Sequence, residues 1–306
     1  MAARATARPG AVTVLWESVR PRSLTVAAVS SVVGTAALAP QRAVQPLIAA
    51  GCLVLALLLQ AATNVLNDAE DALTGADDYT GAGASLAMRR QWINPAQARL
   101  IAAGLFAAAA ILGVSIALAV HRPALLLLGL AALVVGWAYT APPLRLAYRP
   151  LGEAASALPM GLGIVWGTAA AQTAAVPSSV WWAAAALALL TAAILHANNA
   201  RDRSHDASVG KHTLATRVSM DAVVLEFRLL VGGAAVVLAV ALATRGIPLW
   251  CLGAVLPAVM ALLLAARARR DLDAMGWTRL LIGCVQLHML TGITLAAGFV
   301  LSAIRW

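Results

Sequence analysis

The chain has 306 residues, of which 61% are hydrophobic and 11% are charged. About a quarter of the residues of an ordinary soluble domain are charged, so this composition excludes a water-soluble globular protein and predicts that lipid is its main solvent. The net charge of +9 does not indicate a nucleic-acid-binding protein, because the basic residues stand in short clusters between apolar runs instead of in one stripe or tail.

The apolar runs predict an all-α membrane protein that crosses the bilayer repeatedly. A spanning helix needs about twenty mostly apolar residues, because its rise must cover roughly 30 Å of hydrocarbon. Nine segments satisfy this requirement, and with a basic cytosolic tail at residues 1–22 they form a single domain over residues 1–306. The predicted spans are Ser23–Ala39, Val44–Leu66, Ala96–Val120, Pro123–Ala141, Gly152–Gln172, Ser178–Asn198, Ala222–Thr244, Ile247–Ala266 and Arg279–Ile304.

The orientation follows from the unequal distribution of basic residues between alternate connections. Basic residues near the ends of a span are retained on the cytosolic side of the membrane. One side of the predicted bundle carries most of the arginines, and the other side carries only Arg42, Arg122, Arg245 and Arg305. The pattern predicts a cytosolic N-terminus, an external C-terminus and a multi-pass protein of the cell inner membrane.

Two similar polar motifs follow the second and the sixth predicted spans. Each motif places amide and carboxylate side chains on one face of a helix, at spacings of i, i+3, i+7 and i, i+4, i+8. The first face presents Asn64, Asn67 and Asp71, and the second presents Asn198, Asp202 and Asp206. Because four spans separate the motifs, both emerge on the same side, which predicts an internal repeat of about four helices with facing acidic ends.

Acidic residues at membrane depth are costly unless a cation or a partner balances them. Oxygen ligands without His or Cys suit a hard cation, and Mg²⁺ typically takes one or two carboxylates and completes its shell with water and phosphate. The two motifs therefore predict a diphosphate bound by Mg²⁺ between two aspartate clusters. The alternative, that these residues cap helices and balance nearby basic clusters, explains either motif alone equally well but explains the matched pair less well.

The motifs also resemble those of a known family. The strings Asn67-Asp68-x-x-Asp71 and Asp202-x-x-x-Asp206 resemble the UbiA superfamily of intramembrane prenyltransferases, and the resemblance covers nearly the whole chain. The branch that prenylates 1,4-dihydroxy-2-naphthoate in menaquinone biosynthesis is the most similar. That similarity rests on Asn64-x-x-Asn67-Asp68-x-x-Asp71-x-x-x-Gly75-x-Asp77 and Asn198-Asn199-x-Arg201-Asp202-x-x-x-Asp206-x-x-x-Gly210-Lys211-x-Thr213-Leu214-Ala215.

Three further strings support the resemblance, and together they imply a fold and a reaction. The strings are Arg20-Pro21-Arg22-Ser23-Leu24, Tyr139-Thr140-Ala141-Pro142-Pro143-Leu144-Arg145-Leu146 and Tyr148-Arg149-Pro150-Leu151-Gly152-Glu153. The resemblance implies about nine helices around a central lipid-facing cavity. It also implies an enzyme that uses Mg²⁺, with Mn²⁺ as a substitute, to transfer a polyprenyl group from its diphosphate to an aromatic acceptor, with loss of CO₂ from naphthoate. Neither a nucleic acid nor a required protein partner is expected.

The same resemblance assigns roles to individual residues of this sequence. The implied metal ligands are Asn67, Asp71, Asp77, Asp202 and Asp206. The implied catalytic residues are Asp71, Asp202, Asp206, Lys211 and Tyr139. The implied substrate-binding residues are Asn64, Asn67, Asp68, Arg22, Arg145, Asn198, Asn199 and Arg201.

Structural explanations compete with several of these roles. Lys211 and the loop arginines satisfy the positive-inside rule without binding any ligand, and Tyr139 also suits an interfacial anchor. His196 and His288 lie within apolar spans, where a neutral imidazole bonded to a neighbouring helix is the common arrangement.

Two other functional classes remain open at this point. A prenyltransferase of secondary metabolism or a membrane terpene cyclase shares the ionisation step and differs in what traps the cation. An ion-coupled transporter also has many spans and an internal repeat, but transporters usually carry their charges and broken helices near the bilayer midplane.

Overall fold

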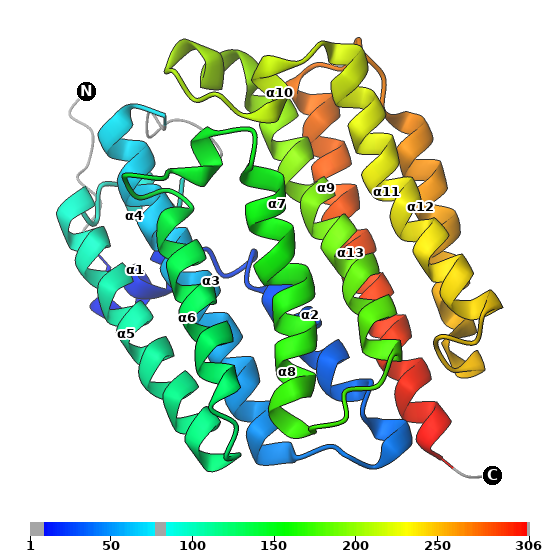
Figure 1. Cartoon of the computed structure of the whole chain (residues 1–306). Coiled ribbons are helices and arrows are strands. Elements are labelled where there is room, and N and C mark those ends of the chain that lie inside the picture. Colours follow the sequence, from blue (N-terminus) through cyan, green and yellow to red (C-terminus); the bar gives the residue numbers. More distant parts are fainter. Residues whose placement is uncertain (1–8, 77–83, 305–306) are drawn as a thin grey trace.

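The computed structural model describes residues 9–76 and 84–304, and within these ranges every regular element is helical. Figure 1 shows the helices packed side by side in one bundle, most of them running between its upper and lower ends. The long helices are α3 (Pro46–Thr74), α5 (Pro95–Ala119), α9 (Ser179–Ser208), α11 (Met220–Ala243) and α13 (Ala274–Ala303). The shorter α-helices are α1 (Ala11–Ser18), α2 (Thr25–Ala36), α4 (Leu86–Arg89), α6 (Ala124–Ala138), α7 (Gly152–Ser156), α8 (Ile164–Gln172), α10 (Leu214–Arg217) and α12 (Val255–Arg267).

Short irregular helices complete several of these elements. A π-helix, Ala157–Gly163, joins α7 to α8 and makes one continuous span over Gly152–Gln172, as the sequence predicts. The 3-10 helix Leu249–Ala254 leads directly into α12. Two further 3-10 turns lie at Ala39–Gln41, after α2, and at Leu146–Tyr148, before α7.

Among the described residues, seven helical segments are long and apolar enough to cross a membrane. The first and fourth predicted spans correspond to shorter apolar helices, Thr25–Gln41 and Ala124–Ala138. Neither of these reaches the roughly twenty residues that a perpendicular span needs. The all-helical membrane fold is confirmed, while the count of nine spans and the cytosolic N-terminus stay predictions.

Two helices continue well beyond the ends that hydropathy predicts. The sequence places span ends at Leu66 and Asn198, but α3 continues to Thr74 and α9 to Ser208. A hydropathy rule ends a span where the apolar run ends, whereas a helix continues until its backbone hydrogen bonding is interrupted. Gly75 and Gly210 follow the two helices with φ of 74° and 75°, a left-handed conformation that favours glycine. Both polar motifs therefore lie on rigid helix and not in loops.

The predicted tail at residues 1–22 contains a helix that the sequence analysis misses. In α1, Val14 and Ser18 are buried against the bundle. On the other side Val12 and Trp16 are exposed, with relative exposures of 84% and 58%. The helix therefore presents apolar residues on both sides, and only one side packs on the protein.

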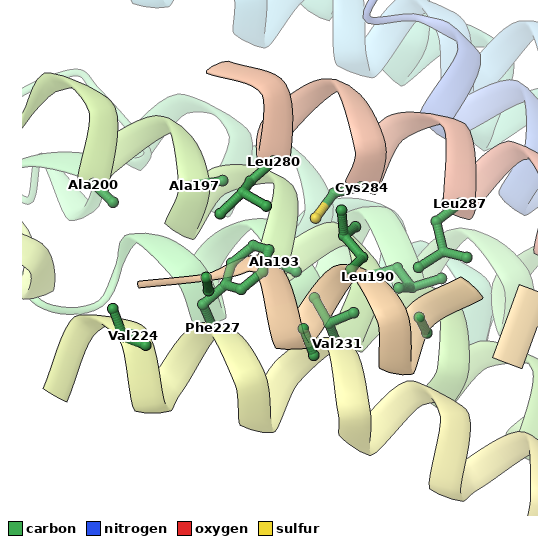
Figure 2. Packing of buried hydrophobic residues seen from close by; sticks show 14 of the residues in the cluster. Leu190, Ala193, Ala197, Ala200, Val224, Phe227, Val231, Leu280, Cys284 and Leu287 are labelled. Carbon is green, nitrogen blue, oxygen red and sulfur yellow. The ribbon is translucent and has the colours of Figure 1, made fainter. Parts of the chain in front are cut away.

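The largest buried cluster joins α9 to α11, α12 and α13 (Figure 2). Alanines of α9, including Ala193 and Ala197, allow the neighbouring helices to approach closely, and Phe227 of α11 packs edge-on against Trp277 of α13 with ring centroids 5.7 Å apart. Small residues are common where membrane helices pack, because close backbone approach strengthens van der Waals contact. This packing holds α9, which carries the second polar motif, rigidly in the bundle.

Candidate active site

Three segments that lie far apart in the sequence meet at the upper end of the bundle in Figure 1. They are the last turns of α3, the loop that contains the 3-10 turn Leu146–Tyr148, and the end of α9 with the loop that follows it. The amide of Lys211 donates to the carbonyl of Asp206 at 2.8 Å, and the amide of His212 donates to the carbonyl of Tyr148 at 3.1 Å. These hydrogen bonds hold the second motif against the same loop that contacts the first motif.

Tyr148 connects the two motifs, and the sequence analysis gives it no role although it quotes the residue in a motif string. Its hydroxyl donates to Oδ1 of Asp71 at 2.5 Å and lies 2.7 Å from Oγ1 of Thr74. Burial, together with the charge and hydrogen bond of Asp71, raises the pKa of the Tyr148 hydroxyl. Tyr148 therefore stays protonated and orients the Asp71 carboxylate by donating to it.

The ammonium group of Lys211 lies among three aspartates. Its Nζ is 3.5 Å from Oδ1 of Asp206, and the charges of Asp71 and Asp202 also act on it. The same Nζ lies 5.6 Å from the ring centroid of Tyr148, within reach of a cation–π interaction. Burial alone lowers the pKa of Lys211, but the surrounding carboxylates raise it by more, so its pKa lies above the ordinary value of lysine. The cluster therefore contains a permanent cation at neutral pH.

Asp71 accepts hydrogen bonds on both carboxylate oxygens. Nδ2 of Asn67, one turn earlier on α3, donates to Oδ2 at 2.8 Å, and Tyr148 donates to Oδ1. Each oxygen retains a further lone pair, because a carboxylate offers about four acceptor positions. Asn67 and Tyr148 together fix the direction in which those remaining lone pairs point.

Asp202 forms a pair with its neighbour on α9. Nε and Nη2 of Arg201 bind its two oxygens at 2.7 and 2.5 Å, and Nη2 also donates to Oδ1 of Asn198 at 2.8 Å. The Asp202 side chain is one third exposed, at 33%. The Arg201 side chain is 11% exposed, so an incoming cation would share this carboxylate with a largely buried arginine.

Other predicted site residues hold the N-terminal segment in place. Nδ2 of Asn64 donates to the carbonyl of Val19 at 3.1 Å and to Oγ of Ser23 at 2.8 Å. Asp68 is fully buried; one of its oxygens binds Nη2 of Arg20, and the other accepts from the amide of Ser85 at 3.0 Å. The substrate-binding roles of Asn64 and Asp68 stay predictions, but the geometry favours a structural role for both.

The remaining predicted residues surround the cluster or lie apart from it. Arg145 lies 5.6 Å from the ring of Tyr148, and its buried Nε has no hydrogen-bond partner in the described part of the chain. Tyr139, at the end of α6, is within reach of the charges of both Asp71 and Glu153. Arg22 is exposed. Asp77 lies outside the described residues.

The two membrane histidines differ in their environment. Nε2 of His196 lies 2.9 Å from the carbonyl of Val223 on α11, which confirms the expected bond to a neighbouring helix. His288 is equally buried, but neither of its ring nitrogens has a hydrogen-bond partner within residues 9–76 and 84–304. The expectation of a bonded imidazole is therefore wrong for His288.

The donor set of the cluster fits a hard divalent cation. Across the described ranges, no three His, Cys, Asp or Glu side chains converge closely enough to hold a metal ion by themselves. Mg²⁺ does not require that, because it usually takes one or two carboxylates and leaves its other positions to water and phosphate. Oδ2 of Asp206 is buried without a hydrogen-bond partner among the residues described, although an unsatisfied buried oxygen is costly. Asp71, Asp202 and Asp206 are the residues that would hold the cation.

The sequence and the fold both have known relatives. A 1,4-dihydroxy-2-naphthoate octaprenyltransferase from Bacillus subtilis is 32% identical over 202 residues, an alignment that covers 66% of this chain and 65% of that protein. The chain thus spans slightly less than two thirds of the length of this curated relative.

Two solved structures share the fold. The apo structure of a UbiA homologue from Aeropyrum pernix aligns with a TM-score of 0.69 at 16% identity, over 92% of this chain and 98% of that one. A UbiA homologue from Archaeoglobus fulgidus, solved bound to GPP and Mg²⁺, aligns with a TM-score of 0.64 at 14% identity, over 92% and 99% of the two chains. The model of the UbiA prenyltransferase family matches residues 27–290, and the chain therefore belongs to that family.

Proposed function

We propose that this chain transfers a polyprenyl group from polyprenyl diphosphate to 1,4-dihydroxy-2-naphthoate, with loss of CO₂, at the cytosolic face of the cell inner membrane. The naphthoate acceptor is proposed from the name of the B. subtilis relative and from the string that runs from Asn198 to Ala215. The divalent cation is proposed from the donor set and from the Mg²⁺ bound by the A. fulgidus homologue.

The observation that carries the proposal is the position of Lys211 among Asp71, Asp202 and Asp206. Three carboxylates from two distant helices supply oxygen ligands that suit divalent cations, and Lys211 and Arg201 balance part of their charge. The same ammonium group suits the phosphate oxygens that such cations bring with them. A site built for a neutral substrate would need neither set of charges.

Each residue of the cluster has a distinct part in this reaction. Asp71, Asp202 and Asp206 bind the diphosphate through Mg²⁺, which when bound neutralises the charge that develops on the leaving diphosphate. Lys211 and Arg145 donate charge-assisted hydrogen bonds to its outer oxygens. As the bond between C1 and the diphosphate oxygen breaks, its electron pair leaves with diphosphate, and the ring of Tyr139 faces the allylic cation.

The test is a transfer assay with purified protein in lipid nanodiscs, labelled polyprenyl diphosphate and Mg²⁺. Transfer to 1,4-dihydroxy-2-naphthoate, with release of labelled CO₂ from its carboxylate, is the expected result. Asp71→Ala and Asp206→Ala should each abolish turnover while the proteins remain folded in detergent. Asp271→Ala is the matched control, because Asp271 is exposed and lies outside the cluster.

Each other outcome identifies a different function. Transfer to a different phenol but not to naphthoate would keep the prenyltransferase and replace the acceptor. Cyclic or hydrolysed prenyl products without any acceptor would indicate a terpene cyclase. Full activity of Asp71→Ala or Asp206→Ala would refute the proposed diphosphate site.

A further inference from the structure

A second polar cluster lies on the membrane side of the aspartates, and the reaction described above leaves it without a role. It joins α7, α9 and α11 through Glu153, His196, Asn199 and Glu226. Figure 1 shows α7 and α9 side by side at the centre of the bundle. His196, Asn199 and Glu153 are all buried, at 0%, 3% and 7% exposure. Polar groups at such depth are expensive, so they mark a functional site by default.

The hydrogen bonds of this cluster fix the protonation of its histidine. Nε2 of His196 lies 2.9 Å from the carbonyl of Val223, and since a carbonyl only accepts, Nε2 carries a hydrogen. Nδ1 faces two carboxylates, Oε1 of Glu153 at 3.5 Å and Oε2 of Glu226 at 3.6 Å. A bare nitrogen lone pair between two carboxylates is repelled by both. At least one proton must therefore be shared among His196, Glu153 and Glu226.

One atom of the cluster is left ready to accept another proton. Oε1 of Glu153 accepts from Nδ2 of Asn199 at 2.9 Å and lies next to His196. These donors stabilise the ionised form of the carboxylate. Its other oxygen, Oε2, is buried and has no hydrogen-bond partner in the part of the chain that the structure describes. Glu153 therefore presents one occupied and one vacant acceptor oxygen.

Glu153 stands at the start of a closely packed helical segment. The π-helix that follows α7 lies so close to α9 that a Cβ on Gly161 would stand 2.2 Å from Cα of Ala188. Such contact leaves no room for a side chain, so only glycine fits at this position. π-Helical segments occur frequently at functional sites. Glu153 lies in α7, which leads directly into this π-helix, and therefore stands on a helix and not in a loop.

The distance between the aspartate cluster and the Glu153 cluster suits a substrate with a charged diphosphate and an apolar chain. At a rise of about 1.5 Å per residue, Asn199 lies roughly 5 Å deeper along α9 than Asp202 and roughly 10 Å deeper than Asp206. The charges of both Asp71 and Glu153 act on Tyr139, so both clusters lie within electrostatic range of this one side chain. A diphosphate bound by the aspartates would place the reactive C1 carbon of its apolar chain on the membrane side, at the depth of Glu153.

We propose that Glu153 faces the aromatic acceptor and takes the proton of its hydroxyl group during prenyl transfer, while Asn199 and His196 act as positioning residues. The inference rests on the proposed function. In this step the O–H bond of the acceptor breaks and the proton goes to Oε2 of Glu153. The electron pair stays on oxygen and conjugates into the ring, and a ring carbon bonds to C1 as the bond from C1 to the diphosphate oxygen breaks. The ring carbon then loses its carboxylate as CO₂, the electron pair of that C–C bond restores the aromatic ring, and the oxygen takes the proton back from Glu153.

The experiment compares wild type and Glu153→Gln over a series of naphthol acceptors with increasingly acidic hydroxyl groups. Glutamine keeps the shape of the side chain but does not accept a proton at neutral pH. The expected loss in kcat is about a hundredfold or more for the least acidic acceptor, and the loss should shrink steadily as acidity rises. Release of diphosphate without an acceptor should be retained, because the aspartate cluster is intact. Asp271→Asn serves as the exposed control.

A loss of equal size for every acceptor would overturn the inference, because a purely structural role is indifferent to acceptor acidity. Retention of wild-type kcat would overturn it as well. If Glu153→Gln does not fold, Glu153→Asp replaces it; an acidity-dependent loss supports the proposal and a uniform loss refutes it. If wild type transfers to no acceptor in the series, the proposed function itself fails. That result is distinct, because it appears before any variant is measured.

Discussion

Replacing Lys211 by methionine removes the ammonium group that lies among the three aspartates while keeping an unbranched side chain. The Lys211 side chain is 13% exposed, and its Nζ is 3.5 Å from Oδ1 of Asp206. A charge-assisted hydrogen bond from such an ammonium group to a phosphate oxygen contributes about 1.5–3 kcal/mol. The change should therefore lower kcat/KM for polyprenyl diphosphate roughly tenfold to a hundredfold. Lys211→Arg should retain part of the activity.

The same substitution should not weaken the binding of Mg²⁺. Lys211 competes with a divalent ion for Asp206, so removing it should leave the apparent affinity for Mg²⁺ unchanged or increase it while turnover falls. A mutation that merely disturbed the fold would weaken both. A loss of turnover without a loss of Mg²⁺ affinity therefore distinguishes a lysine that binds diphosphate from a structural lysine.

The assay measures initial rates over prenyl diphosphate and Mg²⁺ concentrations, with Arg217→Met as the control. Arg217 is exposed and ends α10, the short helix that follows Lys211, and its replacement removes the same charge. Lys211 is also the only lysine in the sequence, so an amine-selective reagent modifies one side chain, and diphosphate with Mg²⁺ should protect it. Wild-type kinetics in Lys211→Met, or equal losses in both variants, would refute the reasoning and leave Lys211 as a topology charge.

Three further changes test other contacts. Tyr148→Phe removes the donor to Asp71 and keeps the ring under Lys211, so Mg²⁺ affinity should fall roughly tenfold in a metal titration of activity, and an unchanged titration would exclude the orienting role. Asp68→Asn should cost about 1–3 kcal/mol of stability, because it removes the charge of a buried carboxylate that binds Arg20. KM for prenyl diphosphate should stay unchanged in the folded fraction, and a raised KM at wild-type stability would instead make Asp68 a substrate residue. EDTA should abolish turnover, and Mg²⁺ or Mn²⁺ should restore it; activity in metal-free buffer would eliminate the mechanism.

Helical periodicity explains the contact between Asn67 and Asp71 but not the direction of Asp68. Asn67 donates to Asp71 one turn later on α3, as residues on one helix face should. Asp68 follows Asn67 by one residue, which turns it about 100° around the helix and toward Arg20. The motif string contains both residues without distinguishing these directions.

Contacts between distant segments are the part that the sequence does not reveal. Tyr148 and Glu153 both stand in a string that the sequence analysis quotes, yet no spacing rule connects Tyr148 to Asp71, or Glu153 to Asn199. Those contacts depend on how the loop after α6 folds back over α3 and on how closely the π-helix approaches α9. Both are consequences of tertiary packing, to which local periodicity is insensitive.

The length of α9 places the second motif and the buried polar cluster on the same helix. Because this helix continues to Ser208, Asp206, Asp202, Asn199 and His196 lie on successive turns of one rigid rod. The rod runs from a cluster that suits a metal diphosphate, at the upper end of the bundle in Figure 1, to a cluster that shares a proton deeper in the bundle. A substrate with a charged head and an apolar tail can bind along this helix in one orientation only. Burying its head among the apolar residues is costly, and so is leaving its tail in water. The reactive carbon between head and tail then lies between the two clusters, where both the departing diphosphate and the attacking ring have a partner.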